Sequence, residues 1–220
     1  MSDARGRGAA YDRAVLHCPA TLYIARHGDA EYDGDHRLMS DDGGRLSETG
    51  QVQVSECAHA LAGQRVAAVY SSTMTRAVQS GVLAAGLLDV AHHALDGLVE
   101  VRVGERAGQP WSDPVTREVY AAWFDGDLDR RIPGGESGRE VMARFTEALE
   151  TIADQHRGEQ VLVFTHGAVM SLVVPRLSHN VRDDLAYLQF LPNAVPARVE
   201  GGDDGWRVVS WPGSASKDLI

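Results

Sequence analysis

The chain has 220 residues, a hydrophobic content of 44% and a formal net charge of −10. This length fits one large domain or two small ones, and the composition is ordinary for a globular protein. The negative charge disfavours nucleic acid and anionic membranes as partners, because both select basic surfaces. The apolar runs are too short to span a bilayer. Its two cysteines, Cys18 and Cys57, are too few for a disulfide framework or a zinc cluster.

The sequence predicts one main domain with a short polar segment at each end. Residues 1–19 form a polar extension without the apolar core of a signal peptide, so we expect a cytoplasmic protein. The domain itself is predicted to cover residues 20–211, and residues 212–220 are predicted to be a tail.

Apolar runs and stretches of helical periodicity alternate along this domain. The predicted strands cover residues 21–25, 66–70, 91–95 and 160–165, followed by a hairpin of strands at 197–200 and 206–210. The predicted helices cover residues 46–63 with Ser47 as the cap, a segment from the cap residues Ser71-Ser72-Thr73 to Leu88, and then 115–124, 138–156 and 168–177. Residues 29–42 are predicted to be a loop.

The strand at residues 160–165 is apolar without alternation, which is typical of a parallel strand that helices cover on both faces. Together with the alternation of strands and helices, this predicts an α/β fold. We expect a three-layer α/β/α sandwich with a mostly parallel central sheet.

Cationic groups follow three of the predicted strands. Arg26 and His27 follow the first strand, Arg76 lies in the first helical turn after the second, and His166 follows the strand that ends at Thr165. Ligands of such sheets bind beyond the carboxyl ends of the strands. A helix start disfavours a cation such as Arg76 unless an anion is held there. The sequence therefore predicts an anion pocket at this edge.

Two further residues suit such a pocket. Gly167 allows the backbone to approach a ligand closely. Glu100 supplies a carboxyl group that can protonate a leaving alkoxide. Taken singly, each residue has an ordinary alternative: Arg76 as an exposed cation, His166 as a structural hydrogen-bonding residue, and Glu100 as a surface acid.

Six ordered motifs resemble the histidine phosphatase superfamily, which includes the phosphoglycerate mutases. The motifs are Arg26-His27-Gly28, Leu46-Ser47-Glu48-Thr49-Gly50, Ser71-Ser72 with Arg76, Leu98 with Glu100, Gly134-Gly135-Glu136-Ser137, and Thr165-His166-Gly167. The resemblance covers roughly residues 20 to 210 and implies a phosphoglycerate mutase-like fold.

The resemblance also implies a mechanism. His27 would take the phosphoryl group as a phosphohistidine, and Arg26, Arg76 and His166 would surround that group. Glu100 would protonate the leaving oxygen and then help to activate the hydrolytic water. Neither a metal nor another cofactor is expected. The implied substrate-binding positions are Arg26, Gly28, Asp33, Arg76, His166 and Gly167.

The chain departs from the family in one loop. Residues 30–33 read Ala-Glu-Tyr-Asp, where many members have Thr-x-Trp-Asn. The leading interpretation is a phosphomonoester hydrolase acting on a small phosphorylated metabolite. Two alternatives are a phosphoglycerate mutase-type phosphoryl transfer and a non-catalytic protein that binds a phospho-ligand. The stretch between Glu100 and Gly134 favours hydrolysis, because its five arginines lie among six acids. The oligomeric state stays open, a homodimer included.

Overall fold

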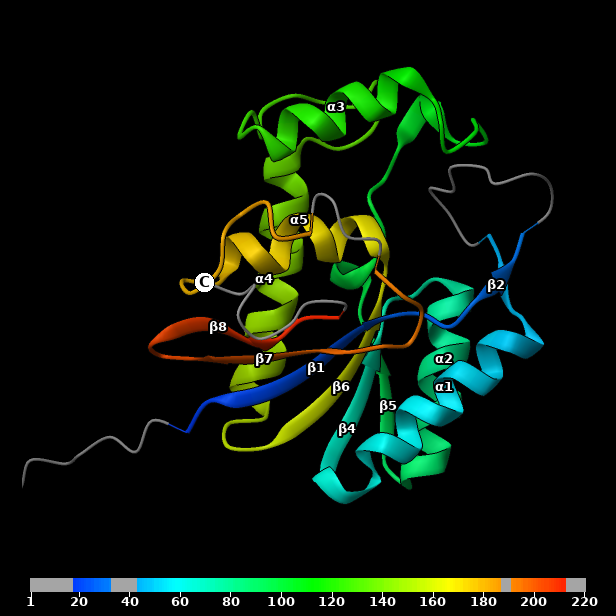
Figure 1. The fold of residues 1–220 in the computed structure, drawn as a ribbon, viewed down its shortest axis with the longest axis vertical. Coiled ribbons are helices and arrows are strands. Elements are labelled where there is room, and N and C mark those ends of the chain that lie inside the picture. The colour runs from blue at the N-terminus through cyan, green and yellow to red at the C-terminus, as the bar shows by residue number, and fades with distance from the viewer. Residues whose placement is uncertain (1–17, 33–42, 187–190, 213–220) are drawn as a thin grey trace, which may run out of the picture.

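A six-stranded sheet forms the centre of the chain (Figure 1). The structure is a computed structural model that describes residues 18–32, 43–186 and 191–212. The strand order is β5-β4-β6-β1-β7-β8, in which β5, β4, β6 and β1 are parallel and β7 and β8 are antiparallel. The strands are β1 Ala20–Arg26, β4 Val66–Ser71, β5 Ala91–Ala94, β6 Gln160–Thr165, β7 Ala197–Gly202 and β8 Gly205–Ser210. The predicted, mostly parallel sheet is confirmed.

Helices cover both faces of this sheet, and the alternation along β1 shows why. Leu22 and Ile24 share one core with α4 and α5, whereas Tyr23 and Ala25 share a second core with α1 and α2. The α-helices are α1 Glu48–Leu61, α2 Thr75–Leu88, α3 Pro114–Phe124, α4 Gly138–Gln155 and α5 Gly167–Leu177. The short 3-10 helices are η1 Ala62–Gln64, η2 Asp96–Leu98 and η3 Gly104–Arg106. The expected three layers are therefore present.

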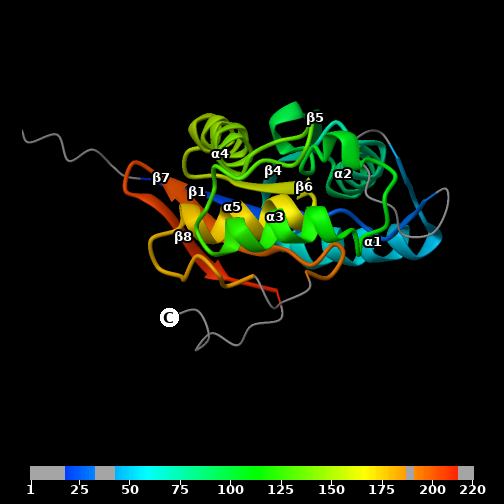
Figure 2. The same cartoon turned by 90° about the horizontal axis from the view of Figure 1, so that it is seen from above.

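Helix α3 lies apart from these layers. It is at the top of Figure 1 and is the helix nearest the viewer in Figure 2. Its apolar side chains Val119 and Trp123 are buried in the same core as those of α4 and α5. Within the described residues, no helix combines the length and the apolar character needed to cross a membrane.

Two local predictions need correction. The predicted cap at Ser71-Ser72-Thr73 is wrong, because β4 continues through Ser71 and the N-cap of α2 is Met74, which makes no side-chain cap bond. The predicted loop at 29–42 contains a short strand in its described part, β2 Ala30–Glu31, which pairs with β3 Arg45–Leu46. The predicted cap of α1 is confirmed, since the Ser47 hydroxyl accepts a hydrogen bond from the Gly50 N–H.

The strand register brings three strand ends to the same level. Arg26 at the end of β1 pairs with Thr165 at the end of β6. The next residue, His27, donates its backbone N–H to the carbonyl of Thr165 at 2.9 Å. On the other side of β6, the Ser72 N–H binds the carbonyl of Phe164 at 3.0 Å. The residues that directly follow β1, β4 and β6 therefore meet at one edge of the sheet.

Candidate active site

Three side chains from different elements form a buried cluster at this edge. Arg76 Nε lies 3.0 Å from His27 Nε2, and Arg76 Nη2 lies 3.1 Å from His166 Nδ1. The ring centroids of His27 and His166 are 5.2 Å apart. All three side chains are at least 97% buried. The sequence predicts that these residues lie together, and the structure brings them into hydrogen-bonding contact; we call them the His27–Arg76–His166 cluster.

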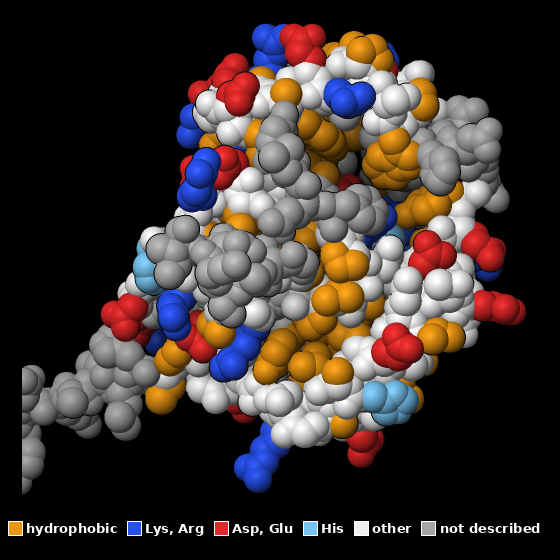
Figure 3. Space-filling view, in the orientation of Figure 1, with side chains coloured by type: hydrophobic (Ala, Val, Ile, Leu, Met, Phe, Trp, Pro, Cys, Tyr) orange, Lys and Arg blue, Asp and Glu red, His pale blue; other side chains and the backbone are white. Residues whose placement is uncertain are grey.

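A hollow opens on the face shown in Figure 3, in the orientation of Figure 1. Arginine or lysine atoms, histidine atoms and aspartate or glutamate atoms are visible within it, and hydrophobic atoms form part of its rim. It lies below α3, on the side of the sheet where β1 and β6 end. The hollow therefore brings groups of both charges and histidine to the surface below α3.

The hydrogen bonds of His27 fix which ring nitrogen carries the proton. Its Nδ1 lies 2.6 Å from the carbonyl oxygen of Gly28, which can only accept, so Nδ1 carries the hydrogen. Its Nε2 faces Arg76, which can only donate, so Nε2 carries the lone pair. The nitrogen that is free to act as a nucleophile is therefore Nε2, and it points at a guanidinium group.

His166 is held in the opposite tautomer. Its Nδ1 accepts from Arg76, so its Nε2 donates to the Ser72 hydroxyl at 2.7 Å. The same hydroxyl accepts the Met74 N–H at 3.2 Å, and both Ser72 and His166 are fully buried. The sequence places Ser72 in a family motif but does not indicate its role. In the structure its hydroxyl binds His166, a residue distant in the chain.

Burial and positive charge keep both imidazoles neutral. Burial, then the charge of Arg76, and further the charge of Arg26 lower the pKa of His27 to about 3. Burial and the charges around it, that of Arg76 first, lower the pKa of His166 well below its ordinary value. Neutral imidazole is the form with a nucleophilic lone pair, so His27 keeps that lone pair near neutral pH.

A backbone carbonyl and an aromatic ring also contact Arg76. The carbonyl of Gly43 accepts from Arg76 Nη1 at 2.6 Å. The ring of Tyr32 lies with its centroid 5.7 Å from the guanidinium carbon. Tyr32 belongs to the loop that departs from the family pattern, and the neighbouring predicted substrate-binding residue Asp33 lies outside the described residues. The loop that differs from the family pattern therefore contacts Arg76, the central side chain of the cluster.

The other predicted binding residues lie next to the cluster. Arg26 is half-buried, and a Cβ built on Gly167 would lie 3.7 Å from its side chain, so Arg26 runs along the start of α5. The N–H of Gly28 binds the Ser80 hydroxyl at 3.1 Å. Asn193, which belongs to none of the six sequence motifs, donates to the carbonyl of His27 at 2.8 Å.

Glu100 reaches the same edge from an irregular segment and is only 8% exposed. Its Oε1 accepts from the N–H groups of Val101 and Val169 at 2.9 and 2.8 Å, and its Oε2 accepts from Ala168 N–H at 3.0 Å. A carboxylate has about four acceptor positions, so these bonds leave one, on Oε2, for a proton or a ligand. The amino end of α5 thus orients this carboxylate, with His166 as the N-cap of the same helix.

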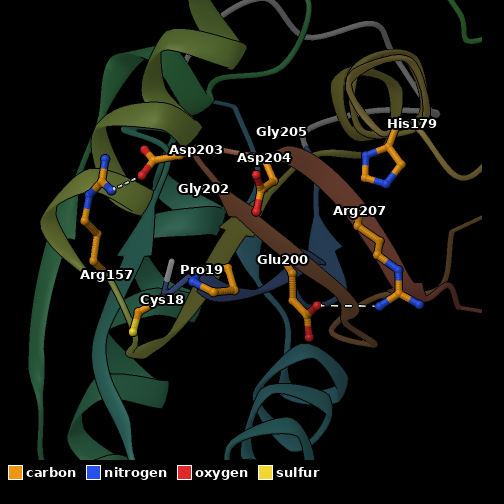
Figure 4. Close-up of a pocket in the computed structure, with 10 residues that line it drawn as sticks. All are labelled: Cys18, Pro19, Arg157, His179, Glu200, Gly202, Asp203, Asp204, Gly205 and Arg207. Carbon is orange, nitrogen blue, oxygen red and sulfur yellow. Dashed lines mark hydrogen bonds and ion pairs between the residues drawn. The ribbon is translucent and has the colours of Figure 1, made fainter. Parts of the chain in front are cut away.

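Two cavities lie away from the cluster. One, of about 200 Å³, is at the amino end of β1 and the turn of the β7–β8 hairpin (Figure 4). Its cations pair with acids: Arg157 with Asp203 at 2.9 Å and Arg207 with Glu200 at 3.7 Å. The other, of about 360 Å³, lies between α4 and the segment after β5. The described residues contain no group of three or more His, Cys, Asp or Glu side chains placed to hold a metal ion.

Comparison with known families gives a match over most of the chain. The model of the histidine phosphatase superfamily (branch 1) matches residues 22–213. The metal-independent phosphoserine phosphatase of Arabidopsis thaliana is 31% identical over 195 residues, which are 86% of this chain and 80% of that protein. The phosphoglycerate mutase-like protein 4 of the same plant is 29% identical over 199 residues, which are 87% of this chain and 84% of that protein.

Solved structures share the fold. A mycobacterial glucosyl-3-phosphoglycerate phosphatase in complex with VO3 has a TM-score of 0.73 at 22% identity, over 88% of this chain and 99% of its own. Bacillus stearothermophilus YhfR has a TM-score of 0.73 at 23% identity, over 90% of this chain and 98% of its own.

Proposed function

The chain belongs to the histidine phosphatase superfamily, and we propose that it hydrolyses small phosphomonoesters through a phosphohistidine formed on His27. The observation that carries this proposal is the tautomer of His27. Its Nδ1 is committed to the Gly28 carbonyl at 2.6 Å, and its Nε2 carries a lone pair in a buried, cationic cluster. A nucleophile beside fixed cations suits attack on a phosphoryl group.

In the first step, His27 Nε2 attacks phosphorus and the bond from phosphorus to the ester oxygen breaks. Glu100, protonated on Oε2, gives its proton to that oxygen, which leaves as an alcohol. Arg76 and Arg26 offset the charge on the equatorial phosphoryl oxygens. The products of this step are the free alcohol and phosphohistidine.

In the second step, a water molecule attacks the phosphohistidine. The Glu100 carboxylate takes one proton from this water, and the bond from phosphorus to His27 Nε2 breaks. Inorganic phosphate leaves, and both residues return to their starting protonation states. Dividing the reaction in this way replaces one difficult displacement by two easier ones.

We further propose that this hydrolysis needs no metal ion. Two guanidinium groups and the amino end of α5 supply the positive field that a metal supplies in other phosphatases. The name of the Arabidopsis phosphoserine phosphatase, which describes it as metal-independent, supports this part of the proposal.

The test is phosphate release from a panel of sugar phosphates, phosphoserine, phosphoglycerates and p-nitrophenyl phosphate, with and without a chelator. We expect release that is insensitive to the chelator and absent in His27→Ala. His179→Ala, which changes an exposed histidine outside the cluster, is the matched control and keeps full activity. Conversion of 2- to 3-phosphoglycerate without phosphate release would establish a mutase instead. Release that survives in His27→Ala would refute the proposal.

A further inference from the structure

The segment that carries Glu100 has no strand of its own to hold it. It runs from η2 to η3 as irregular chain, and its packing against the turn at residues 133–137 is backbone against backbone. A Cβ on Gly135 would lie 2.4 Å from the carbonyl oxygen of Arg102, and a Cβ on Gly104 would lie 2.1 Å from the backbone of Gly134. Something other than a sheet ladder must therefore fix the position of Glu100.

Arg144, in the second turn of α4, supplies that restraint. Its Nη1 donates to the carbonyls of Gly97 and Val99 at 3.0 and 2.8 Å, and its Nη2 donates to the carbonyl of Glu100 at 3.0 Å. The Nε and Nη2 groups also bind the two carboxylate oxygens of Glu136 at 2.7 and 2.9 Å. A guanidinium has five N–H donors in a planar fork, and these five bonds use all of them.

Glu136 restrains the other side of the segment. Besides Arg144, its Oε2 accepts the N–H of Arg102 at 2.7 Å, and its own N–H donates to the Arg102 carbonyl at 3.0 Å. Glu136 is 8% exposed and the Arg144 side chain 15% exposed, so solvent competes little for these bonds. Backbone groups on both sides of Glu100 are thus tied to one buried ion pair.

We infer that Arg144, braced by Glu136, is a positioning residue that holds the Glu100 carboxylate at the reacting group. This inference rests on the proposed function, in which Glu100 is the general acid. The guanidinium contacts the backbone of residue 100, and the carboxylate of that residue contacts the first N–H groups of α5. A change at Arg144 therefore affects the reaction through the position of the Glu100 carboxylate. Lysine cannot replace this arginine, because its three donors lack the planar fork.

The test compares two classes of substrate. An alkyl phosphate needs a proton on its leaving oxygen, whereas the nitrophenolate of p-nitrophenyl phosphate leaves with little help. General acid catalysis contributes about 10²- to 10⁴-fold. We therefore expect Arg144→Lys to lower kcat/KM by about 10²-fold for an alkyl phosphate and by less than about tenfold for p-nitrophenyl phosphate. Glu100→Gln should show the same dependence on the leaving group.

The matched control is Arg139→Lys. Arg139 lies on the same helix and binds Asp129 with two exposed hydrogen bonds, and its replacement should change neither rate. The double variant Arg144→Lys with Glu100→Gln should lose no more on the alkyl phosphate than Glu100→Gln alone. If Arg144→Lys does not fold, Glu136→Gln is measured instead, since its amide oxygen still accepts the Arg102 N–H.

The outcomes separate this inference from the proposed function. If Glu100→Gln shows the leaving-group dependence and Arg144→Lys lowers both rates equally or not at all, the positioning role is refuted and the acid role of Glu100 stands. If Glu100→Gln itself shows no such dependence, the proposed role of Glu100 fails, and the inference fails with it.

Discussion

Two adjacent buried serines allow a sharp test of how the cluster is held. The Ser72 hydroxyl accepts two hydrogen bonds, one from His166 Nε2 of the cluster at 2.7 Å and one from the Met74 N–H at 3.2 Å. Ser71 is equally buried, but its hydroxyl binds the Ser72 carbonyl and His92 Nε2 at 2.8 and 2.9 Å, outside the cluster. Replacing either serine with alanine removes the same atom from the same strand end.

The two replacements should therefore cost similar stability. A buried donor left without an acceptor costs about 1–3 kcal/mol. For a chain of this length, about 1 kcal/mol lowers Tm by roughly 2–4 °C, so each variant should melt roughly 2–12 °C lower. Scanning calorimetry of both variants under the same conditions measures this loss.

Activity should separate the two variants. In Ser72→Ala the Nε2–H of His166 loses its acceptor, so only the bond from Arg76 Nη2 to Nδ1 still holds the ring in this tautomer and orientation. If the lost 1–3 kcal/mol falls on the transition state, kcat/KM drops about 5- to 150-fold. Ser71→Ala should keep kcat/KM within about threefold, because its bonds reach neither His27 nor His166. Equal losses of kcat/KM in the two variants would refute this reasoning.

Three further predictions concern the cluster and its supports. Arg76→Lys should lower kcat/KM by about 10²- to 10³-fold, because an ammonium group cannot reach both imidazoles as the fork does; a loss below tenfold would contradict this. The free energy of unfolding should fall as the pH drops from 6.5 toward 3, because unfolded His27 gains a proton there while the folded residue, with its lowered pKa, does not. Urea titrations at several pH values should show that the free energy of unfolding of His27→Asn falls less steeply over this pH range. The same slope in the variant and in the unchanged protein would be the contrary result. Gly28→Ala should lower Tm, because its Cβ would lie 2.6 Å from the Gly50 carbonyl oxygen. Gly86→Ala, in open space on α2, should instead stabilise the protein by about 0.5–1 kcal/mol. The reverse order of the two Tm values would count against the packing described.

The convergence of the cluster was predictable from the sequence for a simple physical reason. The carboxyl ends of parallel strands share one edge of a sheet, so His27 and His166, each directly after an apolar run, had to lie at that edge. Their contact with Arg76 depends on the register between β1 and β6, in which Arg26 pairs with Thr165. The local sequence does not determine this register. The catalytic roles of these residues stay predictions.

Side-chain partners distant in the chain were not predictable. Serine is a common helix-capping residue, yet the Ser72 hydroxyl binds the ring of His166, 94 residues away. Helix α2 begins after Met74 without a side-chain cap. Arg144 lies in an ordinary amphipathic helix pattern, and only the fold shows that it holds carbonyls 44 to 47 residues earlier. Propensity and periodicity describe neighbours within a turn or a strand, and neither encodes such pairs.

The most direct test of the proposed mechanism is to locate the phosphoryl group on the enzyme. The protein is mixed with p-nitrophenyl phosphate, denatured in alkali within the first turnover, and examined by phosphorus NMR and peptide mass spectrometry. We expect an alkali-stable, acid-labile phosphohistidine on His27, attached at Nε2, because Nδ1 is committed to the Gly28 carbonyl at 2.6 Å. A label on Nδ1, a label on another residue, or turnover without any labelled enzyme would contradict the mechanism.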